Sequence, residues 1–346
     1  MQFRLLALIS LLACQFLAKP ASAEALLLRI SLQQPISNPI GQNLTEFKHF
    51  VEEKTHGAVK VDIYDKAQFY LDYQVPEAVS SGAIEMGVAP LAQYAEDVPA
   101  AGLFMQPFLF NFGAIVRAAA ARRGEIRSAI DAEIEKKSRV RVLWWQPYGP
   151  NVILGKGSLA NPQAIAKHNV RVFDDVSAEF IRLCGGNPEI ISDAKQSEAF
   201  DMNIIDSSVA SIASVKDEEL WRKIDTITNI RHSENLFLVV INQKSFESLS
   251  VEQQRIVMEA AEKAEKDIWS KFHEIETEPY QFAASKGIKI QELVPDDTVA
   301  WRICSSNILE SYMERAGGLG ARLFAAYGRL RADPCCSVQA SVAGWR

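Results

Sequence analysis

Histidine, serine and glycine motifs that commonly support catalysis or phosphate binding do not occur in this sequence. It has no G-x-S-x-G nucleophile elbow and no Walker-type glycine loop. The glycine-rich segment 317–320 follows a predicted helix rather than a strand, and it lacks the third glycine of a dinucleotide-binding fingerprint. We therefore predict that the protein is not an enzyme and uses no cofactor.

The histidines give no sign of a metal site. They form no pair at i, i+4 and no His/Cys set with zinc spacing. His273, Glu274 and Glu276 could form a metal-binding face, but on a highly charged helix surface we expect them to be solvated. We predict no metal centre from the five histidines, which are His49, His56, His168, His232 and His273.

Arg171 is the side chain best suited to ligand chemistry, and it lies between the apolar residues Val170 and Val172. A guanidinium presents two parallel donors that match the two oxygens of a carboxylate, and it stays charged when water is excluded. From the residues alone, an exposed arginine on a strand is the simpler interpretation. The sequence around this position must decide between the two.

Strands and helices alternate along most of the chain, an order that predicts a mostly parallel α/β sheet with helices on both faces. Ser250 and Gln253 form a predicted capping box at the start of an unusually long helix. The predicted strands are 26–32, 59–63, 84–88, 140–145, 152–154, 170–173, 188–191, 204–205, 235–242 and 288–293. The main predicted helices are 177–184, 251–272 with an extension towards 285, and 296–315, which the glycines at 317 and 318 should end.

Length and charge restrict the classes of function. The 346 residues exceed what one ordinary core needs, so we expect two lobes. The net charge is −6, and it becomes −8 if residues 1–23, with their two basic and no acidic residues, are removed. No basic run is present, which argues against nucleic acid or an anionic membrane surface as a partner.

The N-terminus has the pattern of a secretory signal peptide over residues 1–23. An almost wholly apolar run from Phe3 to Leu17, with Arg4 as its only charge, precedes the small-x-small site Ala21-Ser22-Ala23. The run is shorter than the roughly 20 residues that span a bilayer. A lipoprotein site at Cys14 is the alternative. In an oxidising compartment a Cys184–Cys304 disulfide is permitted, although buried free thiols explain these cysteines equally well.

Four segments, in order and at matching spacing, resemble the DctP family of periplasmic substrate-binding proteins of TRAP transporters. The likeness covers nearly the whole chain after residue 23. Its segments are Phe47-x-x-Phe50 to Val61 with Gln68, 77–79 and 82–87; Val98-Pro99 with 107–110; 169–172 with 185–188, 197–200 and 204–206; and 240–242 with Phe246, Leu249 and 253–254.

The resemblance implies a two-lobed periplasmic binding protein fold with a cleft between the lobes and a long helix spanning both. Lobe I would comprise 24–149 and 236–273, lobe II 150–235 and 274–330, and a tail 331–346. The lobes would close around a small organic acid by bending near 149 and 235 and present it to TRAP permease subunits. Some relatives form homodimers through their C-terminal helices.

The same resemblance assigns the candidate ligand contacts. It places Arg171 on the ligand carboxylate. Asn151 falls where some relatives carry a second arginine that binds a carboxylate, so its presence argues against a di-acid ligand. Asp174 favours a ligand with hydroxyl or ammonium groups, and we expect a hydroxylated monocarboxylate. The remaining candidates, each of which could instead be a capping or loop residue, are Gln33, Tyr70, Asp72, Gln93, Asp193 and Ser208.

Two other functional classes fit the sequence. One is a periplasmic sensing module that partners a signalling receptor, and the other is a periplasmic enzyme of the same lobed shape whose catalytic residues come from distant segments. Turnover of a bound acid would favour the enzyme, and neighbouring genes for a kinase would favour the sensor.

Overall fold

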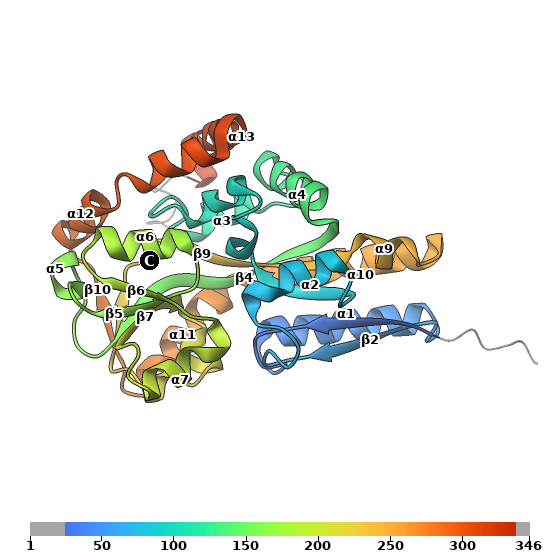
Figure 1. Cartoon of the computed structure of the whole chain (residues 1–346), viewed down its shortest axis with the longest axis horizontal. Helices are drawn as coiled ribbons and strands as arrows, with labels where there is room; N and C mark the ends of the chain where they lie inside the picture. Colours follow the sequence, from blue (N-terminus) through green and yellow to red (C-terminus); the bar gives the residue numbers. More distant parts are fainter. Residues whose placement is uncertain (1–24, 337–346) are drawn as a thin grey trace, which may run out of the picture.

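The computed structural model describes residues 25–336. The predicted signal peptide and residues 337–346 of the predicted tail lie outside this range. Two α/β lobes lie side by side and are joined by the strands β4 (Val140–Gly155) and β9 (Glu234–Asn242) (Figure 1). No helix within 25–336 combines the length and hydropathy that a membrane span requires.

The first lobe follows the predicted alternation of strands and helices. Asn38 begins its first helix by accepting a hydrogen bond from the Gly41 amide, with Pro39 at the first helical position. Gly82 ends another helix in the left-handed conformation. The elements are β1 (Leu26–Ser31), α1 (Pro39–Lys54), β2 (Val59–Tyr64), η1 (Asp72–Gln74), α2 (Val75–Ser81), β3 (Met86–Pro90), η2 (Leu91–Tyr94), η3 (Pro99–Met105), α3 (Gly113–Ala119) and α4 (Glu125–Ser138).

The second lobe contains shorter strands. Its third one, β7, begins at Ser207 and not at the predicted 204–205, because the small residues 207–211 are the ones buried in the sheet. The elements are α5 (Pro162–Ile165), β5 (Asn169–Val172), α6 (Asp175–Leu183), β6 (Asn187–Ile190), η4 (Asp193–Lys195), α7 (Gln196–Asp201), β7 (Ser207–Ser211), α8 (Ser214–Asp217), η5 (Leu220–Arg222), β8 (Thr226–Asn229) and β10 (Lys289–Glu292).

Strand β4 is one element where the sequence predicts two strands, 140–145 and 152–154. Pro147, Gly149 and Pro150 suggest a break, but a register shift against β9 between Pro147 and Gly149 absorbs it and the ladder continues. Strand order is β2-β1-β3-β9-β4-β7-β5-β6, with β8 between β4 and β10. Every antiparallel pair involves β4 or β9, so the sheet is mixed rather than mostly parallel.

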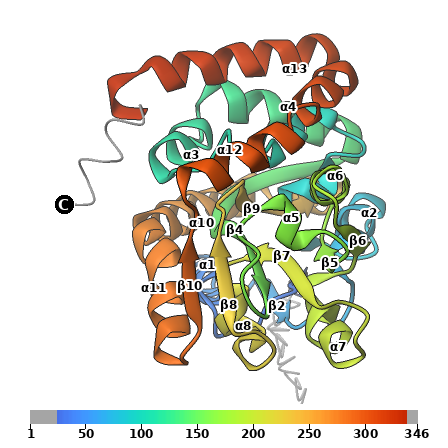
Figure 2. The same ribbon diagram turned by 90° about the vertical axis from the view of Figure 1, so that its left-hand side faces the viewer.

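The predicted long helix is two helices, α10 (Val251–Ser270) and α11 (Phe272–Ser285), which meet at Lys271. The capping box of Ser250 and Gln253 is confirmed. After the short α9 (Gln243–Glu247), α10 lies against α1 and β4, while α11 lies beside β10 and α8 of the second lobe (Figures 1 and 2).

The last helices correct the sequence analysis. One predicted helix over 296–315 is two, α12 (Pro295–Cys304) and α13 (Ile308–Ala332), followed by η6 (Pro334–Cys336). Gly317 is non-helical, with φ 55° and ψ −140°, so the predicted stop is a kink inside α13, beyond which a further helical segment packs across the first lobe (Figure 2). The Tyr327 hydroxyl donates to the Leu109 carbonyl at 3.0 Å.

Cys184 and Cys304 form a disulfide, which decides a question that the sequence leaves open. It joins the C-terminal end of α6 to the C-terminal end of α12, across 120 residues of sequence. Their Cα atoms lie 5.2 Å apart. The bond therefore ties the segment after α11 to the second lobe.

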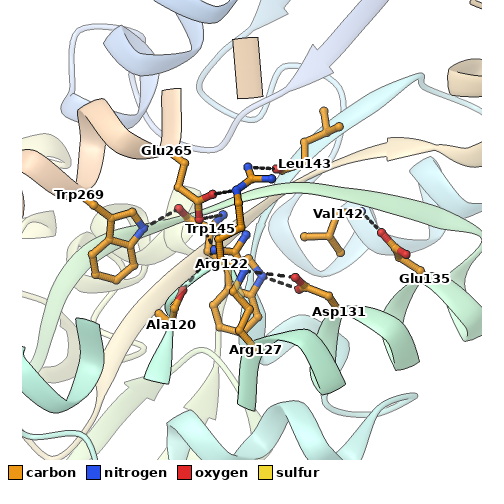
Figure 3. Close-up of polar contacts among 10 residues, drawn as sticks. All are labelled: Ala120, Arg122, Arg127, Asp131, Glu135, Val142, Leu143, Trp145, Glu265 and Trp269. Atoms are coloured by element: carbon orange, nitrogen blue, oxygen red, sulfur yellow. Dashed lines mark hydrogen bonds and ion pairs between the residues drawn. The ribbon is translucent and has the colours of Figure 1, made fainter. Parts of the chain in front are cut away.

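A buried ion cluster fixes α4, β4 and α10 together in the first lobe (Figure 3). Glu265 accepts hydrogen bonds from both Arg122 and Arg127, and only 1% of Arg127 is exposed. Asp131 pairs with Arg127 and accepts from the Trp145 indole at 2.7 Å. Burial raises the pKa of Asp131 to about 6.

Candidate functional site

Arg171 lies at the centre of the second lobe on β5, and its side chain is fully buried. Its Nε donates to the Ile191 carbonyl at 2.7 Å, and its Nη1 donates to the Val209 carbonyl at 3.2 Å. Its Nη2 donates to the Asp193 carboxylate at 2.5 Å. A guanidinium has five N–H groups. Among the described residues these three bonds leave one N–H on Nη1 and one on Nη2 for another acceptor.

Asp72 and Asp193 bring the two lobes into contact next to Arg171. Asp72 begins η1 of the first lobe and is 1% exposed, while Asp193 begins η4 of the second. The Asp193 amide lies 3.4 Å from Asp72 Oδ2. Burial, and then the negative charge of Asp193, raise the pKa of Asp72.

Glu218 is a partly buried residue beside this group that the sequence analysis missed. Gln196 donates to one of its oxygens and accepts from the Ser208 hydroxyl at 3.0 Å. Burial, and then the negative charge of Asp193, raise the pKa of Glu218 well above its usual range. The chain Ser208–Gln196–Glu218 thus connects β7 to the residue that follows α8.

Polar residues of the first lobe complete the group. Gln33, just after β1, donates from Nε2 to the Tyr70 carbonyl at 2.6 Å. Tyr70 contributes this carbonyl, while its ring packs against the main hydrophobic core. Gln93, in η2, donates to the Phe173 carbonyl of the second lobe at 2.9 Å. This bond and the contact of Asp72 with Asp193 join the two lobes.

Asp174 and Asn151 have structural partners. Asp174 is the N-cap of α6, and its two carboxylate oxygens accept from the amide and the hydroxyl of Ser177, each at 2.8 Å. Burial raises the pKa of Asp174. Asn151, on β4, donates from Nδ2 to the Ser233 hydroxyl at 2.9 Å. Its own amide donates to the Ser233 carbonyl, so Asn151 holds β4 to the segment before β9.

Two cavities lie between the lobes beside this group. The larger one, about 790 Å³, is lined by Gln33, Asp193 and Glu218 among others. The smaller one, about 410 Å³, is lined by Asp72, Gln93 and Asp174 among others. Because Asp72 lines one and Asp193 the other, their contact separates the cavities. Arg171 and Asn151 are not among the lining residues of either.

The fold and the interlobe cleft agree with a sequence-family match. The model of bacterial extracellular solute-binding protein family 7, the DctP family, matches residues 30–316. The chain belongs to this family. The match spans both lobes and the joining strands, so the two-lobed fold expected from the resemblance is confirmed.

Relatives of this DctP-family protein show how far the likeness extends. The C4-dicarboxylate-binding periplasmic protein of Rhodobacter capsulatus is 23% identical over 309 residues, 87% of this chain and 90% of that protein. A Bordetella pertussis extracytoplasmic solute receptor binding pyroglutamic acid superposes with a TM-score of 0.84 at 20% identity, over 88% of this chain and all of that one. A Chromohalobacter salexigens TRAP solute-binding protein with bound D-glucuronate has a TM-score of 0.80 at 22% identity, over 87% of this chain and 99% of that one.

Among the predicted site residues, the DctP-family chain brings Arg171, Asp193 and Asp72 into one contiguous group. Gln33 and Ser208 join it through the larger cavity and the Gln196 side chain. Glu218 was missed because it lies in the acidic run 217–219, which in sequence resembles a solvated helix end. No local pattern distinguishes it, since its burial depends on α8 folding back onto β7.

Proposed function

We propose that this DctP-family protein captures a small organic acid by closing its lobes and delivers it to a TRAP permease without altering it chemically. The observation that carries the proposal is the buried guanidinium of Arg171, which keeps two N–H groups available beside an interlobe cleft. Such a group pairs most strongly with a carboxylate.

Closure of the cleft strengthens this interaction. In the open form the ligand carboxylate would meet Arg171 while still partly hydrated. When the lobes approach, water leaves and the local dielectric constant falls, so the attraction between the two charges increases. Asp72 and Gln93 from the first lobe would then complete the enclosure, because each already bonds across the cleft.

The names of the relatives support a carboxylate ligand. They bind C4-dicarboxylates, pyroglutamic acid and D-glucuronate, which have a carboxylate in common. Beyond that group these ligands differ in size and charge. We therefore transfer only the carboxylate to this chain, and we assign it to Arg171.

We place the hinge where the chain passes between the lobes, near residues 149 and 235 on β4 and β9 and at the junction of α10 and α11. Gly149 has a φ of 94°, and Lys271 interrupts the helix. Hinges absorb backbone rotation at a few such positions. The proposed ligand contacts remain Arg171, Asp193, Asp72, Gln33, Gln93, Tyr70, Ser208, Asp174 and Asn151.

Export to the periplasm follows from the family, and we assign it to a signal peptide at residues 1–23. A homodimer through the C-terminal helices is part of the proposal as well. Sedimentation of the mature chain, residues 24–346, would test the dimer, and N-terminal sequencing of the exported protein would test the cleavage after Ala23.

The experiment that tests the function is a thermal-shift screen of the mature chain with organic acids, amino acids and neutral sugars. We expect the stabilising compounds to carry a carboxylate. Calorimetry would then measure affinity, and mass spectrometry would show the ligand unchanged after incubation. Stabilisation by neutral sugars alone, or conversion of the bound acid, would contradict the proposal.

A further inference from the structure

Negative charge predominates on both sides of Arg171. Five acidic and two basic side chains line the larger cavity. Four acidic and one basic side chain line the smaller cavity. One of the two lysines of the larger cavity, Lys216, already pairs with Glu278 at 2.5 Å. Acidic side chains therefore outnumber basic ones along both cavities.

The carboxyl groups closest to Arg171 exceed the positive charge available to them. Asp193 pairs with Arg171 directly, and Asp72 and Glu218 both lie within range of that guanidinium and of Asp193. Burying carboxylates without a compensating positive charge is costly. In the absence of a further cation, burial holds the pKa of Asp72 and of Glu218 above their ordinary values.

Unpartnered polar atoms in the larger cavity give an independent indication. The Gln33 side chain is 4% exposed and donates its amide nitrogen to the Tyr70 carbonyl, so its oxygen is the free end. Within residues 25–336, neither Gln33 Oε1 nor Glu218 Oε1 has a hydrogen-bond partner. Both are acceptors, and both residues line the same cavity as Asp193. These two acceptors therefore have room for a hydrogen-bond donor that the described residues do not supply.

We propose that the ligand is a zwitterion, an amino-carboxylic acid whose carboxylate meets Arg171 and whose ammonium group lies among Asp193, Glu218 and the Gln33 carbonyl, with Asp72 alongside. This inference rests on the proposed function, since it keeps Arg171 as the carboxylate partner. An ammonium group supplies three N–H donors and one positive charge, which are the two features that the site lacks.

Other organic acids fit this group less well. A hydroxyl donates one hydrogen bond but leaves the excess carboxylates uncompensated. A dicarboxylate adds a second negative charge to a region that already contains too many. The proposal thus changes the expectation from sequence, a hydroxylated monocarboxylate, to an amino acid.

A panel of matched acids tests the ligand class. The members of each triplet differ only in whether one position carries an ammonium, a hydroxyl or a second carboxylate. One triplet is 4-aminobutyrate, 4-hydroxybutyrate and glutarate, and 2-amino and 2-hydroxy isomers are included. We expect calorimetry to show that the best amino acid binds at least tenfold more tightly than its hydroxy and di-acid counterparts. Equal or tighter binding of those counterparts would overturn the zwitterion and leave the organic-acid function standing. Binding of none of the panel would overturn both.

Two substitutions locate the ammonium group. Glu218→Gln and Asp72→Asn each remove one negative charge with almost no change of shape. We expect each to weaken binding of the best amino acid at least tenfold and to leave its hydroxy counterpart unchanged or tighter. Glu198→Gln, on the exposed face of α7, is the matched control and should change neither. An unchanged ratio of the two affinities in both cleft variants would refute the assignment.

Discussion

Substituting Arg171 by lysine separates the structural and ligand-binding roles of this side chain. Arginine reaches three acceptors from three different nitrogens, namely the Ile191 and Val209 carbonyls and the Asp193 carboxylate. A lysine ammonium is a single point at the end of a flexible chain and keeps at most one of them. The variant therefore loses two hydrogen bonds with a charged donor.

The expected magnitudes follow from these bonds. Each hydrogen bond to a charged group contributes about 1.5–3 kcal/mol, so the free energy of unfolding of the unliganded variant should fall by about 3 kcal/mol or more. The ligand carboxylate loses one arm of a two-pronged contact. That loss weakens binding by about tenfold to a hundredfold.

Urea unfolding of the unliganded protein measures the first effect, and calorimetry with the tightest acid from the screen measures the second. Calorimetry is done at a temperature where circular dichroism shows the variant to be folded. Arg182→Lys, on the exposed side of α6, is the control and should change neither quantity. Near-normal affinity of the folded Arg171→Lys variant would refute the role of Arg171 in ligand binding.

Three further predictions concern stability. Glu265→Gln removes the carboxylate that Arg122 and Arg127 share and leaves Asp131 as the carboxylate partner of buried Arg127, so it should lower the free energy of unfolding by about 3–5 kcal/mol. The exposed Glu262→Gln should change this free energy by less than about 0.5 kcal/mol, and equal effects in urea unfolding would contradict the prediction. Replacing Cys184 and Cys304 by serine should lower the free energy of unfolding by about 2–5 kcal/mol. A reductant should lower the Tm of the wild type and leave the Tm of this variant unchanged. Burial lowers the pKa of His232 to about 4, so the unfolded chain takes up a proton that the folded chain does not, and the free energy of unfolding decreases as the pH falls from 6.5 towards 4. This decrease, about 3 kcal/mol, should be missing from His232→Gln when urea unfolding is measured across that pH range.

Much of the fold could be predicted from sequence because its signals are local. The apolar run of β1, the alternation of β2 and the Ser250–Gln253 capping box depend on neighbours within a few residues. The resemblance to the DctP family added the order of the lobes and the importance of Arg171. The local elements agree with the structure because the tertiary contacts reinforce the local preferences, whereas the ligand-binding role of Arg171 stays a prediction.

Elements that tertiary contacts alone decide were predicted wrongly. Pro147 and Gly149 suggest a strand break, yet β9 pairs along β4 through two register shifts and makes one strand of it. In β4, pairing with a distant strand outweighed the local preference for a break. Gly317 does interrupt the helix as the sequence predicts, and only the packing across the first lobe shows that a second helical segment follows it.

The sequence by itself determined the fold class, the family and the arginine that we assign to the ligand. Only the tertiary structure decided what surrounds that arginine. Asp72, Asp193 and Glu218 lie 121 and 25 residues apart along the chain; folding of the second lobe brings Asp193 and Glu218 together, and contact between the lobes adds Asp72. The charge of a binding site is a sum over such distant residues, and it can be evaluated only once folding has brought them to one place.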